Sequence, residues 1–200
     1  MRFISNYSSG KMGIAIAETA ALYGADVELV LGPVDIKPDD DSIIVTNVTN
    51  AAEMAEACVA KFPGCDIAIL SAAVADFTPV ASSEMKIKKN SHGMTLQLKS
   101  TMDIAATLGK MRRDDQFIAG FALETTKGLD EAVDKLKRKN MNMIVLNSLQ
   151  EEGAGFGYDT NRVTIIDKNN NIDKFELKSK AEVARDILDK IISMQADLSE

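Results

Sequence analysis

The chain has 200 residues, of which 46% are hydrophobic and 26% are charged, and its formal net charge is −7. This is the composition of an ordinary globular protein, and the acidic balance argues against general affinity for nucleic acid, which needs a clustered excess of Lys and Arg. The sequence contains neither an apolar run of the roughly 18 residues that a membrane span needs nor a signal-peptide pattern. We therefore expect a cytoplasmic protein that binds neither nucleic acid nor membrane.

In chain order, the apolar periodicity alternates between helices and strands. A helix is predicted from Met12 to Tyr23 with Gly24 as its C-cap, and two later helices are predicted to begin after the capping residues Asn50 and Ser179. The other expected elements are strands at 26–32, 42–48, 116–124 and 141–147, a strand that begins at 66, helices at 102–111 and 128–140, and two hairpins, one pairing 85–89 with 94–99 and one pairing 162–167 with 174–177.

This alternation predicts an α/β fold class: a Rossmann-like, doubly wound and mainly parallel sheet flanked by helices, with appended β-hairpins. No repeat, linker or change of composition divides the sequence, so we expect a single domain over residues 1–200. Ligands of such sheets bind beyond the carboxyl ends of the strands. The loops that follow the predicted strands, and the turn that opens the first helix, are therefore the places to look for a site.

Two cysteines and one histidine offer little chemistry. Cys58 and Cys65 follow no metal or redox spacing and are interpreted as small apolar packing residues. His92 lies in a polar turn and is interpreted as a solvated loop residue.

The stretch SNYSSGKMG, residues 5–13, opens the first helix. Ser8, Ser9 and Gly10 would leave backbone N–H groups unpaired at the helix N-terminus, where the dipole favours an anion, and Lys11 adds a positive charge. Gly13 permits close contact between helix and sheet. The stretch matches neither G-x-G-x-x-G nor the P-loop, and a helix that is simply capped by Ser is an equally good interpretation.

The stretch SAAVADF, residues 71–77, follows a predicted buried strand. Its small residues, from Ser71 onward, would let a flat ligand or an acyl group lie on the backbone amides, and Asp76 could hold a ribose hydroxyl or help to bind a divalent cation. A tight loop in which Asp76 caps its own turn is the alternative.

Two lysine clusters stand out in an acidic protein. Lys86 and Lys88 share one face of a strand and would hold an anion, although lysines that protect an edge strand are a common alternative. Lys135 and Lys139 share one face late in a helix and can reach a phosphate, although cations there also complement the helix dipole. Because these clusters and the opening turn all lie near strand ends, a polyphosphate is their simplest common ligand.

The order of the motifs resembles one family over nearly the whole chain. RFISNYSSGKMG, GPV, AAVADF, KIKK, MDI, GFALET and KLKRKN…IVLN are similar, in this order, to phosphopantothenate–cysteine ligase, the ligase half of the bacterial bifunctional coenzyme A biosynthesis flavoprotein. The resemblance implies an enzyme that joins L-cysteine to (R)-4′-phosphopantothenate. CTP would activate the carboxylate as an acyl-cytidylate with loss of pyrophosphate, and the cysteine amine would then displace CMP.

The resemblance also implies roles for individual residues. Asn6 would turn over the acyl-cytidylate, Arg2 would lie nearby, and Lys86 would bind the triphosphate. The family pattern often has Pro where this chain has Met102. The predicted nucleotide-binding residues are Ser71, Ala72, Asp76, Lys86, Asp103, Ile104, Ala105, Phe121, Lys135 and Lys139, and the predicted phosphate- and substrate-binding residues are Ser8, Ser9, Gly10 and Lys11.

The cofactors and partners follow from the same resemblance. Mg²⁺ would accompany CTP, with Asp76 as the one protein ligand to consider, and no flavin is expected. The family is typically dimeric, and either of the two hairpins could form the dimer. A separate phosphopantothenoylcysteine decarboxylase is a further expected partner. Motif chemistry alone does not distinguish CTP from ATP.

Two alternatives remain open from the sequence. One is a Rossmann-like NAD(P)-dependent reductase, although no G-x-G-x-x-G follows a strand and no Tyr-x-x-x-Lys pair is present. The other is a catalytically impaired nucleotide-binding fragment. In the family, a strand and a loop resembling GxTxExIDPVR precede the opening turn, and this sequence aligns from the final Arg of that loop. We expect the absence of that strand to expose the sides of its neighbours.

Overall fold

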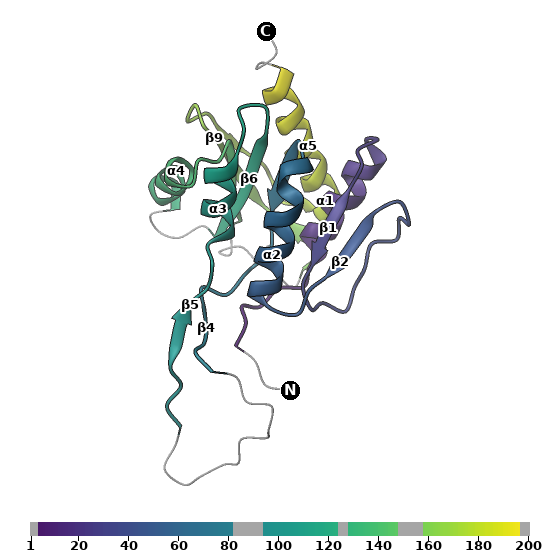
Figure 1. Ribbon diagram of the computed structural model, residues 1–200. Helices are drawn as coiled ribbons and strands as arrows, with labels where there is room; N and C mark the ends of the chain where they lie inside the picture. Colours follow the sequence, from purple (N-terminus) through teal and green to yellow (C-terminus); the bar gives the residue numbers. More distant parts are fainter. Residues whose placement is uncertain (1–3, 82–93, 124–127, 148–157, 197–200) are drawn as a thin grey trace.

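The computed structural model describes residues 4–81, 94–123, 128–147 and 158–196 (Figure 1). Its α-helices are α1 (Lys11–Leu22), α2 (Ala51–Lys61), α3 (Ile104–Met111), α4 (Gly128–Arg138) and α5 (Lys180–Ala196), with a short 3₁₀ turn at Phe62–Gly64. Its strands are β1 (Glu28–Leu31), β2 (Ile44–Asn47), β3 (Ile67–Leu70), β4 (Phe77–Pro79), β5 (Leu98–Ser100), β6 (Phe117–Leu123), β7 (Met143–Asn147), β8 (Thr160–Asn161), β9 (Val163–Asp167), β10 (Ile172–Lys174) and β11 (Lys178–Ser179).

The central sheet has five strands in the order β10-β9-β7-β6-β3. β3, β6 and β7 run parallel, whereas β9 and β10 are antiparallel additions at one edge. The parallel strands are rich in β-branched and apolar residues because both of their faces are covered. This arrangement confirms the predicted mainly parallel α/β sheet.

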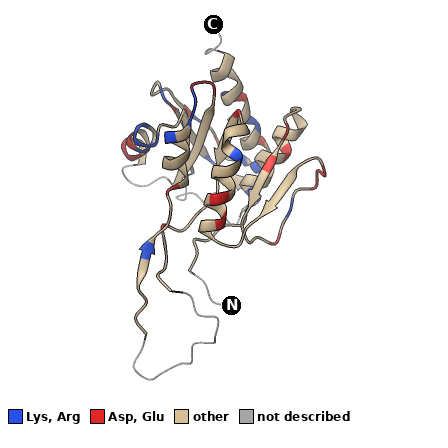
Figure 2. Cartoon of the chain, viewed as in Figure 1, with Lys and Arg blue, Asp and Glu red and all other residues tan. Residues whose placement is uncertain are grey.

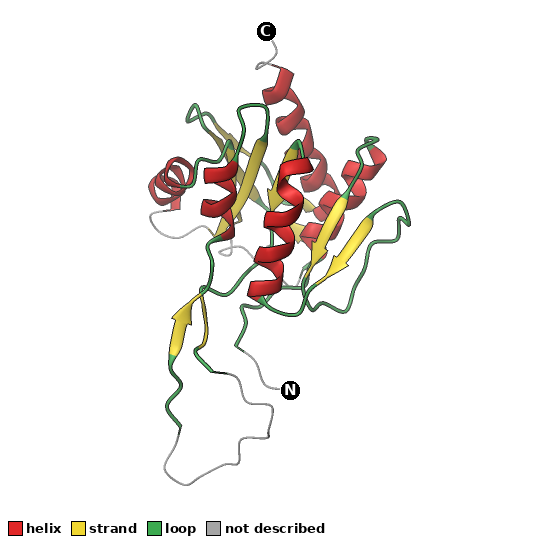
Figure 3. Ribbon diagram, viewed as in Figure 1, coloured by secondary structure: helices red, strands yellow, loops and turns green. Residues whose placement is uncertain are grey.

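Helices cover both faces of this sheet (Figure 3). On one face, α1 and α5 pack against apolar side chains of β6, β7 and β9, with Ile187 and Ile191 of α5 fully buried. On the other face, α2, α3 and α4 pack against the alternate side chains of the same strands, including Ile118 and Ile144. The period-2 alternation of each strand therefore supplies two separate cores.

Three two-stranded sheets complete the described chain. β1 pairs with β2 in parallel, and β8 pairs with β11 in an antiparallel sheet. β4 and β5 form an antiparallel ribbon, called the arm here, which projects away from the helices and the central sheet (Figure 1). Within the described residues, β1 pairs only with β2 and β3 only with β6.

The predicted caps of α2 and α5 are confirmed, whereas α1 ends one residue earlier than predicted, with Tyr23 as its C-cap. Asn50 caps α2 by accepting hydrogen bonds from the N–H groups of Ala52 and Glu53, and Gly24 follows α1 with a φ of 86°. At α5, the Ser179 hydroxyl and N–H both donate to the Glu182 carboxylate, and Ser179 Oγ accepts from the Glu182 N–H at 3.3 Å. This is a capping box, in which the side chain of each residue accepts a hydrogen bond from the backbone N–H of the other.

Two strand predictions differ from the structure in their bounds or partners. Of the strand expected at 94–99, the structure has Leu98–Ser100, which pairs with Phe77–Pro79; the expected partner at 85–89 lies outside the described residues. The second hairpin is confirmed, but its outer strand is Ile172–Lys174 rather than 174–177, because the turn after β9 is tighter than expected. Asp167 tightens that turn by accepting from the N–H groups of Asn169 and Asn171.

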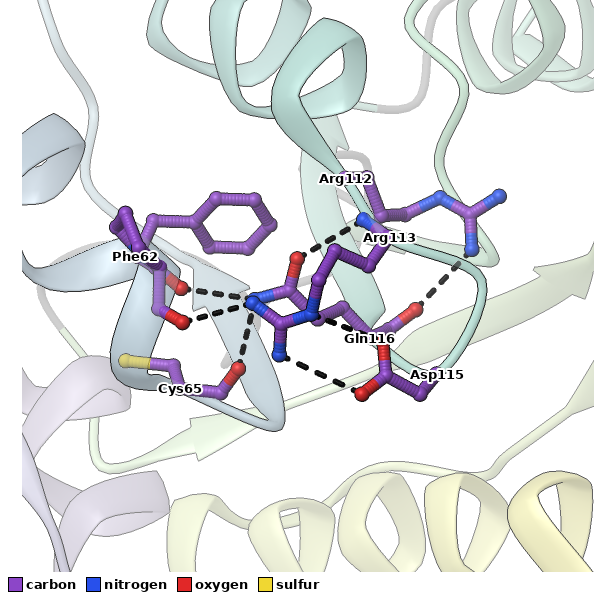
Figure 4. Close-up of polar contacts among 7 residues, drawn as sticks. Phe62, Cys65, Arg112, Arg113, Asp115 and Gln116 are labelled. Atoms are coloured by element: carbon purple, nitrogen blue, oxygen red, sulfur yellow. Dashed lines mark hydrogen bonds and ion pairs between the residues drawn. The ribbon is translucent and has the colours of Figure 1, made fainter.

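Buried polar side chains close the amino ends of β3 and β6 (Figure 4). Gln116 Nε2 donates to the carbonyl oxygens of Phe62 and Cys65, each at 2.8 Å, and its Oε1 accepts from the Arg113 N–H at 3.0 Å. The Arg113 guanidinium bonds the Pro63 carbonyl at 2.7 Å. These bonds fix the turn that leads from α2 into β3.

None of the helices in the described ranges is long and apolar enough to cross a membrane.

Candidate functional site

The candidate site lies where β3, β6 and β7 end, on the side of the molecule from which the arm projects (Figure 1). The loop after β3 is met there by the segment that precedes α1, because Asn6 Nδ2 donates to the Val74 carbonyl at 3.1 Å. Two predicted site segments, 68 residues apart in sequence, are thus in direct contact.

Asp103 and Lys139 form an ion pair between α3 and the end of α4. Lys139 Nζ lies 2.8 Å from an Asp103 carboxylate oxygen, and the Asp103 side chain also caps α3 by accepting from the Ala106 N–H. Partial burial opposes ionisation of Asp103, but the hydrogen bonds from Lys139 and Ala106 outweigh it and hold the pKa of Asp103 below its ordinary value. The carboxylate is therefore charged and fixed in place.

Lys135 is a half-buried cation beside this pair. Burial lowers the pKa of Lys135, and the positive charge of Lys139 lowers it further, whereas the carboxylates of Asp103 and Asp76 raise it. Its Nζ approaches the carbonyl oxygen of Phe121, at the end of β6, at 3.4 Å. Burial and a like charge both disfavour the ammonium form of Lys135. An anion bound nearby would therefore stabilise that charged form.

A cavity of about 190 Å³ lies next to Lys135. Its lining comes from the ends of β6 and β7 and the first turns of α4: Ala122, Leu123, Gly128, Glu131, Ala132, Lys135 and Leu146. It occupies the carboxyl edge of the parallel strands, which is where ligands bind in doubly wound sheets. Figure 2 shows that α4 contains acidic as well as basic residues, so this helix is not uniformly basic.

The loop after β3 approaches α1 closely. A Cβ added to Gly13 would lie 3.0 Å from Ser71 Oγ, tighter than nearly all such contacts, so Gly13 permits the approach that the sequence predicts. Ala72 and Asp76 are exposed in the same loop. The loop therefore presents one exposed carboxylate, that of Asp76, to a ligand.

The opening turn differs in part from the expectation. Gly10 is the N-cap of α1 with a φ of 75°, and no side chain caps this helix; Ser8 Oγ instead accepts from the Gly10 N–H at 3.4 Å. Lys11 Nζ is engaged by Asp159 at 2.6 Å. Asp159 was missed because no sequence signal links it to a lysine 148 positions away.

The remaining predicted residues fall into two groups. Ile104 is buried in the core beneath α3, so only its backbone can face a ligand, and Ala105 is partly buried beside it. Ser9 lies partly buried in the opening turn. Arg2 and Lys86, together with Lys88, Lys89 and His92, lie outside the described residues.

A second pocket, of about 480 Å³, lies between α2 and the root of the arm. Asn50, Glu56, Lys99 and Thr101 are among its lining residues, and none of the predicted site residues in the described ranges lines it. We therefore place the candidate site at the smaller cavity beside Lys135.

A protein metal centre finds no support in the described ranges, where no group of three or more His, Cys, Asp or Glu side chains converges. Asp76 is a single exposed carboxylate.

The fold and the site together define a Rossmann-like α/β protein with a half-buried lysine beside a cavity at the carboxyl edge of its sheet. The chain belongs to the family described as the DNA/pantothenate metabolism flavoprotein C-terminal domain, which it matches over residues 1–194.

Curated relatives agree with this assignment. The chain is 61% identical over 194 residues to a "Cysteine/Cysteine sulfinic acid decarboxylase" from an unknown prokaryotic organism, covering 97% of this chain and 54% of that protein. It is 42% identical over 200 residues to the "Coenzyme A biosynthesis bifunctional protein CoaBC" of Bacillus subtilis, covering 100% of this chain and 49% of that protein. The chain thus spans about half the length of these relatives.

A solved structure matches over the full fold. The crystal structure of the C-terminal domain of coenzyme A biosynthesis bifunctional protein CoaBC is 41% identical, with a TM-score of 0.82, and the match covers 98% of this chain and 90% of that one.

Proposed function

We propose that this chain is a phosphopantothenate–cysteine ligase domain, which joins L-cysteine to (R)-4′-phosphopantothenate in coenzyme A biosynthesis and uses CTP. The observation that carries the proposal is the convergence of Asn6, Asp76, Asp103, Lys135 and Lys139 at one edge of the sheet. These are residues that the resemblance assigns to the nucleotide and the acyl intermediate. The match to the CoaBC C-terminal domain over nearly the whole chain supports the same function.

The chemistry needs two anions to meet, the substrate carboxylate and the α-phosphate of the nucleotide. Lys135 and Lys139 supply positive charge where that repulsion must be overcome, and positioning of this kind lowers the barrier strongly. The carboxylate oxygen attacks the α-phosphorus and pyrophosphate leaves; the cysteine amine then attacks the acyl carbon and CMP leaves. Asn6, held beside the loop after β3, is available to orient the acyl group during the second step.

Mg²⁺ belongs to the same proposal. It would neutralise phosphate charge and be held by the nucleotide, with Asp76 as the protein side chain suited to contact it or its water shell. Because this domain matches one half of longer relatives, a separate decarboxylase is proposed as its partner. A cytoplasmic location is proposed as well. The proposal assigns no role to a flavin.

The decisive test measures pyrophosphate release with CTP, Mg²⁺ and 4′-phosphopantothenate, with and without cysteine. Release without cysteine, and accumulation of the acyl-cytidylate in Asn6→Ala, would support the two-step ligase. Parallel assays with ATP decide the nucleotide, and an assay for CO₂ released from cysteine tests the decarboxylase activity named for the 61%-identical relative. No pyrophosphate with either nucleotide would refute the proposal.

We further propose a homodimer formed through the arm rather than through β9 and β10. The pairing of Phe77 with Ser100 and of Pro79 with Leu98 puts these side chains on one face of the arm, where Phe77 is 53% and Leu98 44% exposed. In the other hairpin, β9 is buried within the central sheet, and Ile172 of the edge strand β10 is its one large exposed apolar side chain, at 47%. Sedimentation of Leu98→Glu beside the wild type tests this, since a charge on that face should shift a dimer to monomer.

Among the described residues, β1 pairs only with β2 and β3 only with β6, and this supports a further part of the proposal. The resemblance leads us to expect that the segment before the opening turn supplies a strand beside these edges. Adding that family segment should then raise the melting temperature and the turnover. Unchanged values for both would refute this part.

A further inference from the structure

The loop after β3 is held by an unusually regular set of contacts at the root of the arm. Three successive carbonyl oxygens in this loop each accept a hydrogen bond from outside it. Asn6 Nδ2 donates to Val74 at 3.1 Å, Thr101 Oγ1 donates to Ala75 at 2.7 Å, and the Thr101 N–H donates to Asp76 at 2.9 Å. Thr101 therefore makes two of the three contacts.

Thr101 is also tied to the other half of the site. Only one residue separates it from Asp103, which caps α3 and pairs with Lys139 at 2.8 Å. The loop after β3 and the start of α3 both supply carboxylates, Asp76 and Asp103, whose charges act on Lys135. The partly buried Thr101 thus joins the loop after β3 to the start of α3, the two segments whose carboxylates act on Lys135.

We propose that Thr101 is a positioning residue of the nucleotide site. Its hydroxyl holds the backbone at Ala75, and so fixes Asp76 relative to the pair of Asp103 and Lys139 before the nucleotide binds. This inference rests on the proposed CTP-dependent function. It adds a residue that is not among the predicted site residues. From the sequence KSTMDI alone, Thr101 is only a polar residue between a strand and a helix.

The test compares Thr101→Val with Thr101→Ser. Valine keeps the shape and the backbone hydrogen bond to Asp76 but removes the donor to Ala75, whereas serine keeps the donor. We expect Thr101→Val to raise the KM for CTP about five- to tenfold, the usual effect of one lost hydrogen bond, with kcat within about twofold. Thr101→Ser should restore the wild-type KM.

Thr19→Val is the matched control. Thr19 Oγ1 donates to the Ala15 carbonyl at 2.7 Å inside α1, so this variant loses the same kind of bond away from the loop. It should lower the melting temperature slightly and leave the KM for CTP unchanged. If Thr101→Val does not fold, Thr101→Ala measured well below its melting temperature serves as the second donor-free variant.

The outcomes separate this inference from the function on which it rests. A wild-type chain that neither releases pyrophosphate from CTP nor is stabilised by CTP against heat would overturn both. A CTP-dependent wild type whose KM is unchanged in Thr101→Val, or changed equally in Thr19→Val, would overturn the role of Thr101 alone.

Discussion

The two ends of the parallel strands carry polar side chains of opposite character. At the amino ends, Gln116 and Asn142 are neutral and each is only 2% exposed, and their amides are bonded to backbone groups of neighbouring turns and strands. At the carboxyl ends, Lys135 and Lys139 are charged neighbours, and Asp76 is exposed. The amides of Gln116 and Asn142 at the amino end are thus satisfied from within, although the Nε of the neighbouring Arg112 is buried without a partner among the described residues, and an anionic ligand would complete the carboxyl end.

This difference suggests that the amino end of the strands serves stability and the carboxyl end serves function. Buried neutral groups that are fully hydrogen-bonded specify a structure, whereas partly buried like charges are costly until a ligand compensates them. Substitutions at the amino end should therefore change the free energy of unfolding, and substitutions at the carboxyl end should change nucleotide-dependent activity.

Gly109 packs α3 against the end of α4, and its replacement should have the largest effect. A Cβ at this position would lie 1.8 Å from the backbone oxygen of Lys139, so α3 and the end of α4 would have to separate. Gly109→Ala should lower the free energy of unfolding by about 3 kcal/mol through overpacking, although alanine ordinarily favours a helix interior. The melting temperature should fall by roughly 6–12 °C, measured by calorimetry.

Gly64→Ala is the control for that substitution, because nothing lies within 4 Å of a Cβ added there. A Gly109→Ala variant as stable as Gly64→Ala would mean that the two helices are not packed through this residue.

Lys135→Gln should have the next largest effect, and on activity alone. It removes a cation that burial and Lys139 make costly, so we expect unchanged or slightly higher stability. CTP-dependent kcat/KM should fall about a hundredfold, equivalent to about 2.7 kcal/mol. Lys137→Gln, two positions away on an exposed part of α4, is the matched control and should stay within about twofold in pyrophosphate-release assays. Equal losses in both variants would contradict a specific role.

Gln116→Met tests the amino end with a side chain of similar size. It removes the bonds that the Gln116 amide makes to the Cys65 carbonyl and the Arg113 N–H, and one of the two bonds to the Phe62 carbonyl, which keeps the Cys65 N–H; the loss should cost about 2 kcal/mol. Urea unfolding should show that loss while kcat/KM for CTP stays at the wild-type value. A loss of activity at temperatures where the variant is fully folded would break the separation between the two ends.

Local features of the fold were predictable from the sequence, whereas long-range pairing was not. The caps at Asn50 and Ser179 depend on residues within one turn, so a short sequence pattern specifies them. The partner of β5 depends on which distant strand it meets. The alternation in residues 94–99 indicates a strand and its two faces, but it does not distinguish Phe77–Pro79 from residues 85–89 as the partner.

The candidate site shows the same limit. Lys135 and Lys139 could be predicted to act together because they lie four residues apart on one helix. The engagement of Lys11 by Asp159 and the two bonds from Thr101 to the loop after β3 join segments far apart in sequence. Residue type alone carries no signal for such contacts, so the groups that hold the site in place emerged only from the fold.

Loss of the ion pair between Asp103 and Lys139 should have the smallest effect on the free energy of unfolding. The pH dependence of that effect tests how much the carboxyl end contributes to stability. The pKa of Asp103 is held below its ordinary value, so its contribution to stability is present above that value, about 3.9, and is lost as the pH falls through the lower, folded-state pKa. Since the Asp103 side chain is 50% exposed, solvent screening keeps the contribution below about 1 kcal/mol.

Asp103→Asn isolates that contribution, because asparagine can still cap α3 but cannot pair with Lys139 as a charge. The difference in free energy of unfolding between wild type and variant should be measurable at pH 7 and should shrink at pH 3, as determined by urea unfolding at both values. Asp103→Ala, which also loses the cap, should cost about 1 kcal/mol more at pH 7. A difference that is constant between the two pH values would show that the ionised form of Asp103 gives no net stability. The charge of Asp103 would then matter for ligand binding only.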